Sequence, residues 1–373
     1  MKHRFHLAAA TLLLGLPAQV KASSPAADQP HARHAWFWRR SAPAPLTAPP
    51  PQLAPAAPKN PAAKTAASRP NTPAPKVAYR KLSPDERDAQ VRLQIFLDTA
   101  LFSPGKVDGQ LGELTTQALL RYQKAHALDP TGKPENLPLP MEEEIYTTYT
   151  IRPEDRKFVG DAPSKPEEQS RKRYLPYGSY LELVTERFHV AESLLAQLNP
   201  TLKLEALTVG DTLTVPAVKP FLIENVQATA SVPPKAEFKT RRIRVDRKGH
   251  VLELLDGEQM LASVPITAGS ETLPTPAGKW RIVGISLLPT FRWDEGVLNH
   301  GVRTENFYNL PAGPNNPVGI AWCALNKPGI GIHGTNRPET IGRAFSHGCM
   351  RVANWDIIRL VDLITVETPV LIE

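Results

Sequence analysis

Apolar residues change their spacing several times along the chain, and the first periodic stretch predicts a pair of helices. Ser83-Pro84-Asp85-Glu86 has the form of a capping box with proline in the first turn, so we expect a helix to begin there. Pro104-Gly105 ends this stretch, and a second one covers residues 114–125. The apolar positions three and four apart in the first stretch are Leu93, Phe96, Leu97, Ala100 and Leu101.

From Phe238 onward the spacing shortens to a period of two, which is typical of strands. Residues 242–245 and 251–255 flank Asp246-Arg247-Lys248-Gly249 and predict a hairpin, and residues 259–268 continue the meander. One helix follows near the end, with Asn354 as its candidate cap. Its expected buried face comprises Ile357, Leu360, Val361 and Ile364. We therefore predict a mainly β domain over residues 237–373 with one closing helix.

Two further regions lie between the helical pair and the β domain. Residues 129–173 are rich in Pro, Glu and Lys and are expected to form an irregular linker, with 141–149 as a candidate helix. Residues 174–217 combine a strand-like start, two short apolar helical stretches and a strand-like end. This pattern predicts a small α+β domain. The fold class is therefore multidomain, with a helical domain over 79–128.

The first 78 residues differ from the rest in composition. A basic start, a short apolar stretch over 7–16 and Val20-Lys21-Ala22 as a cleavage site predict a signal peptide over 1–22 and export to the periplasm or cell wall. The alternative is an uncleaved anchor. Residues 23–78 carry much of the excess of the 39 prolines and predict a Pro/Ala-rich disordered linker. No apolar run reaches about 20 residues, so we expect no stable membrane span after cleavage.

The net charge of +7 and a pI near 9.3 favour an anionic polymer as partner. The basic residues form short scattered clusters without an aromatic platform, and export makes a nucleic acid an improbable ligand. We therefore expect no nucleic-acid partner.

The two cysteines stand in different contexts. Cys323 lies in the apolar run 319–325 and is expected to be a buried, inert thiol, whereas Cys349 lies in the polar run 346–351. A disulfide between them is therefore disfavoured, although exported chains favour pairing. The histidines near Cys349 lack close-spaced partner ligands, so we predict no metal and no cofactor.

Cys349 has the surroundings of a nucleophile. A thiol attacks as thiolate, so a nucleophilic cysteine needs a histidine and a turn that exposes the sulfur. Gly348 permits an unusual backbone conformation, and His333 and His347 are both candidates for the base. Spacing alone does not choose between them. We expect a lowered pKa for Cys349, and hence faster alkylation near neutral pH than for Cys323.

Two modules resemble known wall-binding domains. Residues 93–123, with the turn Asp108-Gly109-Gln110-Leu111-Gly112, resemble the small helical peptidoglycan-binding domain. Residues 174–217 resemble a LysM module through Leu195-x-x-Leu198-Asn199-Pro200 and the ending over 210–216. The usual Gly-Asp-Thr-Leu start is replaced by Gly178-Ser179-Tyr180-Leu181, which puts glycan affinity in doubt. The resemblances imply binding to the wall.

The β domain resembles the catalytic domain of the L,D-transpeptidase family of the YkuD type. The resemblance rests on the run 330–335 (Ile-Gly-Ile-His-Gly-Thr) and, sixteen residues after its histidine, on Cys349 within Ser-His-Gly-Cys-Met-Arg. Thr275-Pro276-Ala277-Gly278, the run 313–319 and Asn354-x-Asp356 add support. The family implies a β-sandwich with one closing helix.

The resemblance also implies roles for individual residues. Cys349 is implied as the acylating nucleophile and His333 as its base, with the Gly334 backbone carbonyl holding the imidazole. Backbone N–H groups near Gly348 and Cys349 are implied as oxyanion donors, and Arg351 as a group that orients a substrate carboxylate or supports the loop. The residues implied on the substrate and oxyanion side are Ser346, His347, Gly348 and Arg351.

The implied reaction is acyl transfer on peptidoglycan. The thiol attacks the third residue of a tetrapeptide stem, releases the terminal D-alanine, and an acceptor amine then resolves the thioester into a 3-3 crosslink. Water as acceptor would make the protein an L,D-carboxypeptidase, and an acceptor lipoprotein would make it a protein-attachment enzyme. The sequence does not choose among them. The alternative from another class is a non-catalytic peptidoglycan-binding envelope protein. The expected partners are peptidoglycan stem peptides and glycan.

Overall fold

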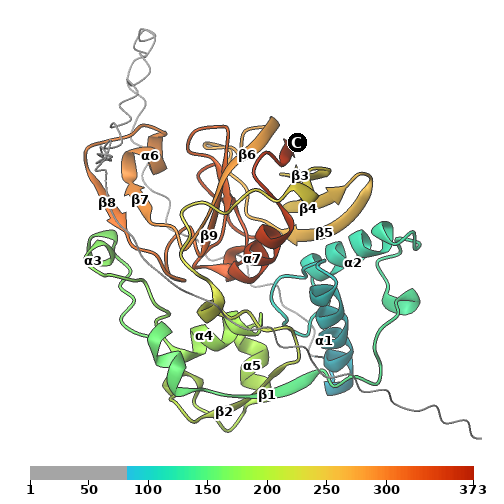
Figure 1. The fold of residues 1–373 in the computed structure, drawn as a ribbon. Helices are drawn as coiled ribbons and strands as arrows, with labels where there is room; N and C mark the ends of the chain where they lie inside the picture. Colours follow the sequence, from blue (N-terminus) through green and yellow to red (C-terminus); the bar gives the residue numbers. More distant parts are fainter. Residues whose placement is uncertain (1–81) are drawn as a thin grey trace, which may run out of the picture. The chain divides into compact units, whose positions relative to one another are not determined.

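A computed structural model of the chain describes residues 82–373 (Figure 1). The predictions for residues 1–22 and 23–78 lie outside the described residues. Among the described residues, no helix combines the length and the apolar character that crossing a membrane requires.

Two helices open the described part. Helix α1 (Pro84–Thr99) begins with the predicted capping box: the Ser83 hydroxyl accepts the Glu86 N–H at 3.2 Å, and Glu86 Oε2 accepts the Ser83 N–H at 2.8 Å. Helix α2 (Glu113–Ala125) covers the second predicted stretch. The two pack around a small core of their own, which comprises Leu93, Leu97, Phe102, Ala118, Leu119, Tyr122 and Met260 of the β domain.

Gln94 organises the turn between α1 and α2. Its side chain is buried, and its Oε1 accepts the N–H groups of Asp108 and Gly109 at 3.1 and 2.9 Å. Its Nε2 donates to Asp108 Oδ1 at 2.8 Å and to Thr115 Oγ1 at 3.0 Å. Gly109 has φ +70°, which glycine adopts with little strain. This network explains the Asp-Gly-x-x-Gly spacing.

The expectation of an irregular linker over 129–173 is wrong for part of that range. Strand β1 (Tyr146–Thr150) pairs antiparallel with β2 (Thr212–Pro216), and helices α4 (Tyr180–Arg187) and α5 (Glu192–Leu198) lie between them in sequence. We call these four elements the α+β unit. No helix forms over 141–149, and the strand-like start expected at residue 174 is only an isolated bridge between Val159 and Tyr177. The true partner of β2 lies more than 60 residues upstream, so local patterns did not reveal it.

The β domain is built on one eight-stranded sheet with the order β11-β10-β9-β6-β12-β3-β4-β5. The predicted hairpin is β3 and β4, paired antiparallel and continued by β5. Parallel pairing occurs between β12 and β3 and between β10 and β11. The fold is mainly β with a closing helix, as predicted, although its strands form one continuous sheet. The strands are β3 (Arg241–Asp246), β4 (Val251–Asp256), β5 (Gln259–Pro265), β6 (Gly278–Leu287), β9 (Ala321–Leu325), β10 (Gly331–His333), β11 (Met350–Arg351) and β12 (Pro369–Ile372).

Shorter elements complete the described chain. A separate two-stranded sheet, β7 (Phe291–Asp294) with β8 (Phe307–Leu310), carries helix α6 (Glu295–His300) between its strands. Short helix α3 (Pro166–Ser170) precedes the α+β unit's two helices. The 3-10 turns are Pro134–Asn136, Pro153–Phe158, Leu204–Ala206, Ile223–Asn225, Ala236–Phe238 and Pro338–Thr340.

Helix α7 (Asn354–Leu363) closes the β domain. Its predicted face is buried, since Ile357, Leu360 and Val361 are each at most 2% exposed. The predicted cap is wrong by one residue: Ala353 occupies the N-cap, and Asn354 is the first helical residue. The Asn354 side chain is engaged elsewhere, as described below, which explains why it does not cap its own helix.

The helical pair and the segment that follows α1 cover the β5 edge of the eight-stranded sheet. Strand β5 is the last strand in the sheet order, and Ser263 on it exchanges backbone hydrogen bonds with the segment after α1. The Ser103 N–H donates to the Ser263 carbonyl at 2.8 Å, and the Ser263 N–H donates to the Leu101 carbonyl at 2.9 Å. An edge strand with unpaired N–H groups favours unwanted pairing, so this contact protects β5.

Candidate active site

Three strands bring the predicted site residues together at one place. His333 ends β10, where it lies opposite Trp322 of β9 and Arg351 of β11. Cys349 immediately precedes β11, and Met350 lies opposite Ile332. The parallel pairing of β10 with β11 therefore places the two separated motifs side by side.

The His333 ring is buried and held in one orientation. Its Nδ1 lies 2.6 Å from the Gly334 carbonyl oxygen, and its ring stacks on Trp322 with centroids 5.2 Å apart. A carbonyl only accepts, so this contact assigns the proton to Nδ1 and leaves Nε2 with a free lone pair. Burial and, to a smaller extent, the Arg351 charge lower the His333 pKa to about 3, against the opposing effect of the hydrogen bond to Gly334. The imidazole is therefore neutral over the physiological range.

The expectation of a lowered pKa for Cys349 is wrong. The residue is partly exposed, and its Sγ donates to the Gly329 carbonyl at 3.4 Å. Burial of the sulfur raises the thiol pKa to about 11, which outweighs the opposing effects of the Gly331 backbone and the Arg351 charge. The resting pair is thus a thiol and a neutral imidazole. Cys323 is fully buried and free, as its apolar strand predicted, and burial raises its pKa to about 12.

Ser346 shapes the turn that carries the thiol. Its hydroxyl donates to the Cys349 carbonyl at 2.5 Å and accepts the Gly348 N–H at 3.2 Å. Gly348 has φ +106°, which favours glycine at this position. The Gly348 N–H is thus engaged within the turn, so of the two expected oxyanion donors near Gly348 and Cys349 the Gly348 N–H already has an acceptor.

The other two predicted residues, His347 and Arg351, differ in burial. His347 is exposed, and within the described residues its ring has no hydrogen bond, so of the two histidines only His333 is fixed. Arg351 is half-buried, and its backbone exchanges two 3.0 Å hydrogen bonds with Thr267. Within residues 82–373 the Arg351 guanidinium pairs with no carboxylate, which leaves its charge available to a ligand.

Asn354 lies beside the backbone of the site, although from the sequence it was expected to cap its helix and to form part of the Asn354-x-Asp356 motif. Its Oδ1 accepts the Ile320 N–H at 3.2 Å, and its Nδ2 donates to Glu186 Oε1 at 3.0 Å. A Cβ added to Gly319 or Gly334 would lie 2.2 Å from Asn354 Oδ1, so both glycines permit its close approach. Glu186 was missed altogether, because a helical residue 168 positions away carries no local pattern that links it to Asn354.

No group of three His, Cys, Asp or Glu side chains within residues 82–373 is placed to hold a metal ion. The chemistry that the described residues support is nucleophilic attack by sulfur, with a fixed neutral imidazole as base.

Comparisons with known proteins match two regions of the chain. Residues 240–372 match the family described as the L,D-transpeptidase catalytic domain, YkuD, and residues 86–137 match a peptidoglycan binding domain. The resemblance of residues 174–217 to LysM stays a prediction.

Several named relatives are similar over the same region. A Bacillus licheniformis protein named L,D-transpeptidase YkuD is 27% identical over 50% of this chain and 89% of its own length. The Bacillus subtilis protein named L,D-transpeptidase YqjB is 36% identical over 25% of this chain and 60% of its own. A crystal structure of Enterococcus faecium L,D-transpeptidase is 23% identical, with a TM-score of 0.29, over 36% of this chain and 50% of the solved chain. This chain therefore spans half the length of that solved chain.

Proposed function

We propose that the protein is an exported, cysteine-dependent L,D-transpeptidase that acts on tetrapeptide stems of peptidoglycan, because residues 240–372 match an L,D-transpeptidase catalytic domain and residues 86–137 match a peptidoglycan binding domain. The observation that carries the proposal is the His333 ring, whose Nδ1 is held by the Gly334 carbonyl beside the strand that Cys349 precedes. This arrangement leaves Nε2 as the base and the sulfur as the nucleophile.

The first half-reaction forms a thioester. His333 Nε2 takes the thiol proton while Cys349 Sγ bonds to the carbonyl carbon of the third stem residue. The tetrahedral intermediate collapses, the bond to the terminal D-alanine nitrogen breaks, and the imidazolium returns its proton to that leaving amine. The Arg351 guanidinium, which pairs with no carboxylate in residues 82–373, is proposed to attract the substrate carboxylate.

The second half-reaction releases the acyl group to an acceptor. An acceptor amine attacks the thioester carbon, gives a proton to His333, and the C–S bond breaks with return of that proton to sulfur. A second stem peptide as acceptor gives a 3-3 crosslink, and this is the outcome we propose. Water gives a shortened stem, and a lipoprotein lysine gives an attached protein.

The raised pKa of Cys349 predicts how the reactivity of the resting thiol depends on pH. With a pKa of about 11, the sulfur is protonated at neutral pH until His333 receives the proton during attack. We predict that iodoacetamide alkylates Cys349 at a rate that keeps rising from pH 7 to about pH 11, measured by mass spectrometry of the intact protein. Cys323 should stay unmodified while the protein is folded. A rate that levels off near neutral pH would instead indicate a preformed thiolate.

The remaining modules fit a wall-localised enzyme. We propose that residues 1–22 direct export, that residues 23–78 act as a tether, and that the peptidoglycan-binding domain holds the enzyme near its substrate. The net charge of +7 favours association with an anionic wall polymer.

The decisive experiment is mass spectrometry of purified disaccharide-tetrapeptide after incubation with wild type, Cys349→Ala and the matched control Cys323→Ala. We expect loss of D-alanine and a crosslinked dimer with wild type and Cys323→Ala, and neither with Cys349→Ala. Loss without dimer would favour the carboxypeptidase. Equal turnover by Cys349→Ala would contradict the assignment of Cys349 as nucleophile. No turnover by any variant would contradict the proposal and favour a binding protein.

A further inference from the structure

We propose that Glu186, on helix α4 of the α+β unit, is a positioning residue for His333, so that this unit is a structural part of the active site. The proposal rests on the proposed function for the role of His333 as base. It differs from the expectation of a separate wall-binding module, because it assigns to α4 an effect on the chemical step.

The first step is the burial and bonding of Glu186. Its side chain is 4% exposed, and its Oε1 accepts both the Tyr177 hydroxyl at 2.8 Å and the Asn354 Nδ2 at 3.0 Å. Burial raises the Glu186 pKa to about 7. Its other charged neighbours are Glu182 and Lys106. A buried carboxyl with two donors on one oxygen is a fixed acceptor, and it orients the Asn354 amide.

The second step leads from Asn354 to the backbone beside the histidine. With Nδ2 held by Glu186, the amide oxygen faces the Ile320 N–H and lies against Gly319 and Gly334. Gly319 has φ +61°, and a Cβ there would also lie 2.5 Å from the Thr335 nitrogen. The amide therefore fills the space in which the two glycine segments meet, and any rotation of it would displace one of them.

The third step connects that backbone to the imidazole. The Gly334 carbonyl oxygen accepts the hydrogen bond from His333 Nδ1–H, and the Gly334 N–H donates to the Ala321 carbonyl at 3.1 Å. The path from the carboxyl to the imidazole thus has three links: a hydrogen bond from Asn354 to Glu186, close packing of the Asn354 amide oxygen against Gly334, and the hydrogen bond from His333 to the Gly334 carbonyl. A shift of the Gly334 peptide would loosen the contact that fixes the tautomer.

A second contact, from the segment that leads into α4, supports the same backbone. The segment before α4 exchanges hydrogen bonds with the loop that leads to Gly319: the Leu175 N–H donates to the Ala312 carbonyl at 2.8 Å, and Asn315 Nδ2 donates to the Pro176 carbonyl at 2.7 Å. A Cβ on Gly313 would lie 2.1 Å from the Leu175 oxygen. The segment before α4 thus contacts the loop at Ala312, Gly313 and Asn315.

The test compares Glu186→Leu with Glu192→Leu, which makes the same change at an exposed site of the same unit. We expect Glu186→Leu to lower kcat about tenfold with an unchanged KM for tetrapeptide, because a small misplacement of the base costs rate and leaves substrate contacts intact. Glu192→Leu should match wild type. Glu186→Gln should retain near wild-type kcat, because its Oε1 still accepts both donors.

A spectroscopic readout separates positioning from general stability. In ¹⁵N-detected NMR of the folded protein, His333 should show the Nδ1–H tautomer in wild type and Glu186→Gln, and a mixture of tautomers in Glu186→Leu. If Glu186→Leu does not fold, Glu186→Asp gives the answer, since it keeps the charge but draws the acceptor back by one methylene.

The outcomes distinguish this proposal from the proposed function. If a folded Glu186→Leu, or Glu186→Asp in its place, keeps wild-type kcat and the wild-type His333 signal, the positioning role is wrong while the transpeptidase stands. If wild type itself has no turnover, the proposed function is wrong, and the NMR comparison alone decides whether Glu186 orients His333.

Discussion

Helix α7 is held by two other parts of the chain. One contact joins an amide to a carboxyl, and the other joins a guanidinium to a carboxylate. At its first residue, the Asn354 Nδ2 donates one hydrogen bond to the Glu186 carboxyl. One turn further on, the Arg359 guanidinium meets the Asp98 carboxylate of α1 through two, with Nη1–Oδ1 at 3.0 Å and Nη2–Oδ2 at 2.9 Å. The groups next to the first contact lead to the backbone beside His333, whereas the Asp98 carboxylate of the second contact bonds His189.

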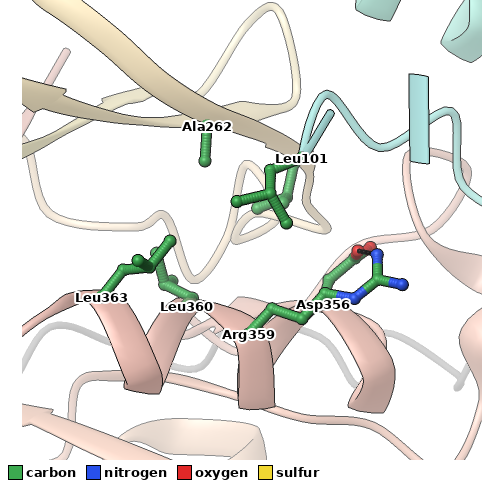
Figure 2. A pocket seen from close by; sticks show the side chains of 7 residues that line it. Leu101, Ala262, Asp356, Arg359, Leu360 and Leu363 are labelled. Carbon is green, nitrogen blue, oxygen red and sulfur yellow. Dashed lines mark ion pairs between the residues drawn. The ribbon is translucent and has the colours of Figure 1, made fainter. Parts of the chain in front are cut away.

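The second contact is a buried polar cluster, which we call the Asp98 cluster: Asp98, His189, Asp356 and Arg359, with Ser103. His189 Nδ1 lies 3.0 Å from Asp98 Oδ1, and the Ser103 hydroxyl donates to Asp356 Oδ2 at 2.8 Å. Figure 2 shows Asp356 and Arg359 on α7, beside the small cavity that Leu101, Ala262, Leu360 and Leu363 help to line.

A buried contact is expected to act on catalysis only if hydrogen bonds and close packing lead from it to the reacting groups. Both contacts hold α7, and both leave buried groups unpaired if one partner is removed. Only the Glu186 contact continues through the backbone that fixes His333. We therefore expect the Asp98 cluster to set stability and the Glu186 contact to set kcat.

The largest effect on stability is expected from Asp98→Ala. The change removes the nearer carboxylate of the Arg359 guanidinium, whose side chain is 19% exposed, and leaves it with Asp356 at 4.0 Å. Breaking a buried ion pair costs about 3–5 kcal/mol, and we expect this loss in the free energy of unfolding by urea. The kcat of the folded fraction should stay at the wild-type value. A fall in kcat as large as that of Glu186→Leu would remove the distinction between the two contacts.

A smaller loss of stability, together with a loss of activity, is expected from Gly319→Ala. The new Cβ would overlap Asn354 Oδ1 and the backbone at Gly334, in addition to the strain of φ +61°. We expect about 2–3 kcal/mol and at least a tenfold lower kcat. Gly257→Ala is the matched control: it has φ +57° and no atom within 4 Å of the added Cβ, so only the strain of about 1 kcal/mol should appear. Equal effects of the two would argue against the close packing of Asn354.

The smallest effect concerns Asp356 and depends on pH. Burial raises the Asp356 pKa to about 7 from an ordinary value of 3.8, so the folded protein holds a proton that the unfolded chain releases between these values. This group's contribution to wild-type stability therefore falls as the pH rises from about 4 to about 7. Asp356→Asn removes the titration, and its stability relative to wild type should increase by about 2 kcal/mol between pH 5 and pH 8. A pH-independent difference in urea unfolding would contradict the raised pKa.

The elements with strong local patterns could be predicted from the sequence. The capping box at Ser83, the hairpin of β3 and β4, and the buried face of α7 depend on residues a few positions apart, and all three are confirmed. Strand β1 was missed because its partner lies more than 60 residues away. Sequence patterns report local preference, and this pairing is decided by tertiary packing.

The candidate site could be predicted in part. The motifs around His333 and Cys349 identified the residues that the strands bring together, and the free state of Cys323 followed from its apolar context. The pKa of Cys349 could not be predicted, because it depends on how deeply the sulfur is buried. Glu186 could not be predicted either, since its role appears only once α4 packs against α7.

The backbone hydrogen bonds between Ser263 and the segment after α1 have a consequence for cutting the chain. A fragment that begins at residue 240 would contain every strand of the large sheet, yet β5 would lose the partner that covers it. Its free N–H and C=O groups could then pair with the same edge of another molecule. The isolated β domain is thus expected to self-associate in solution, because the segment after α1 no longer covers the edge of β5.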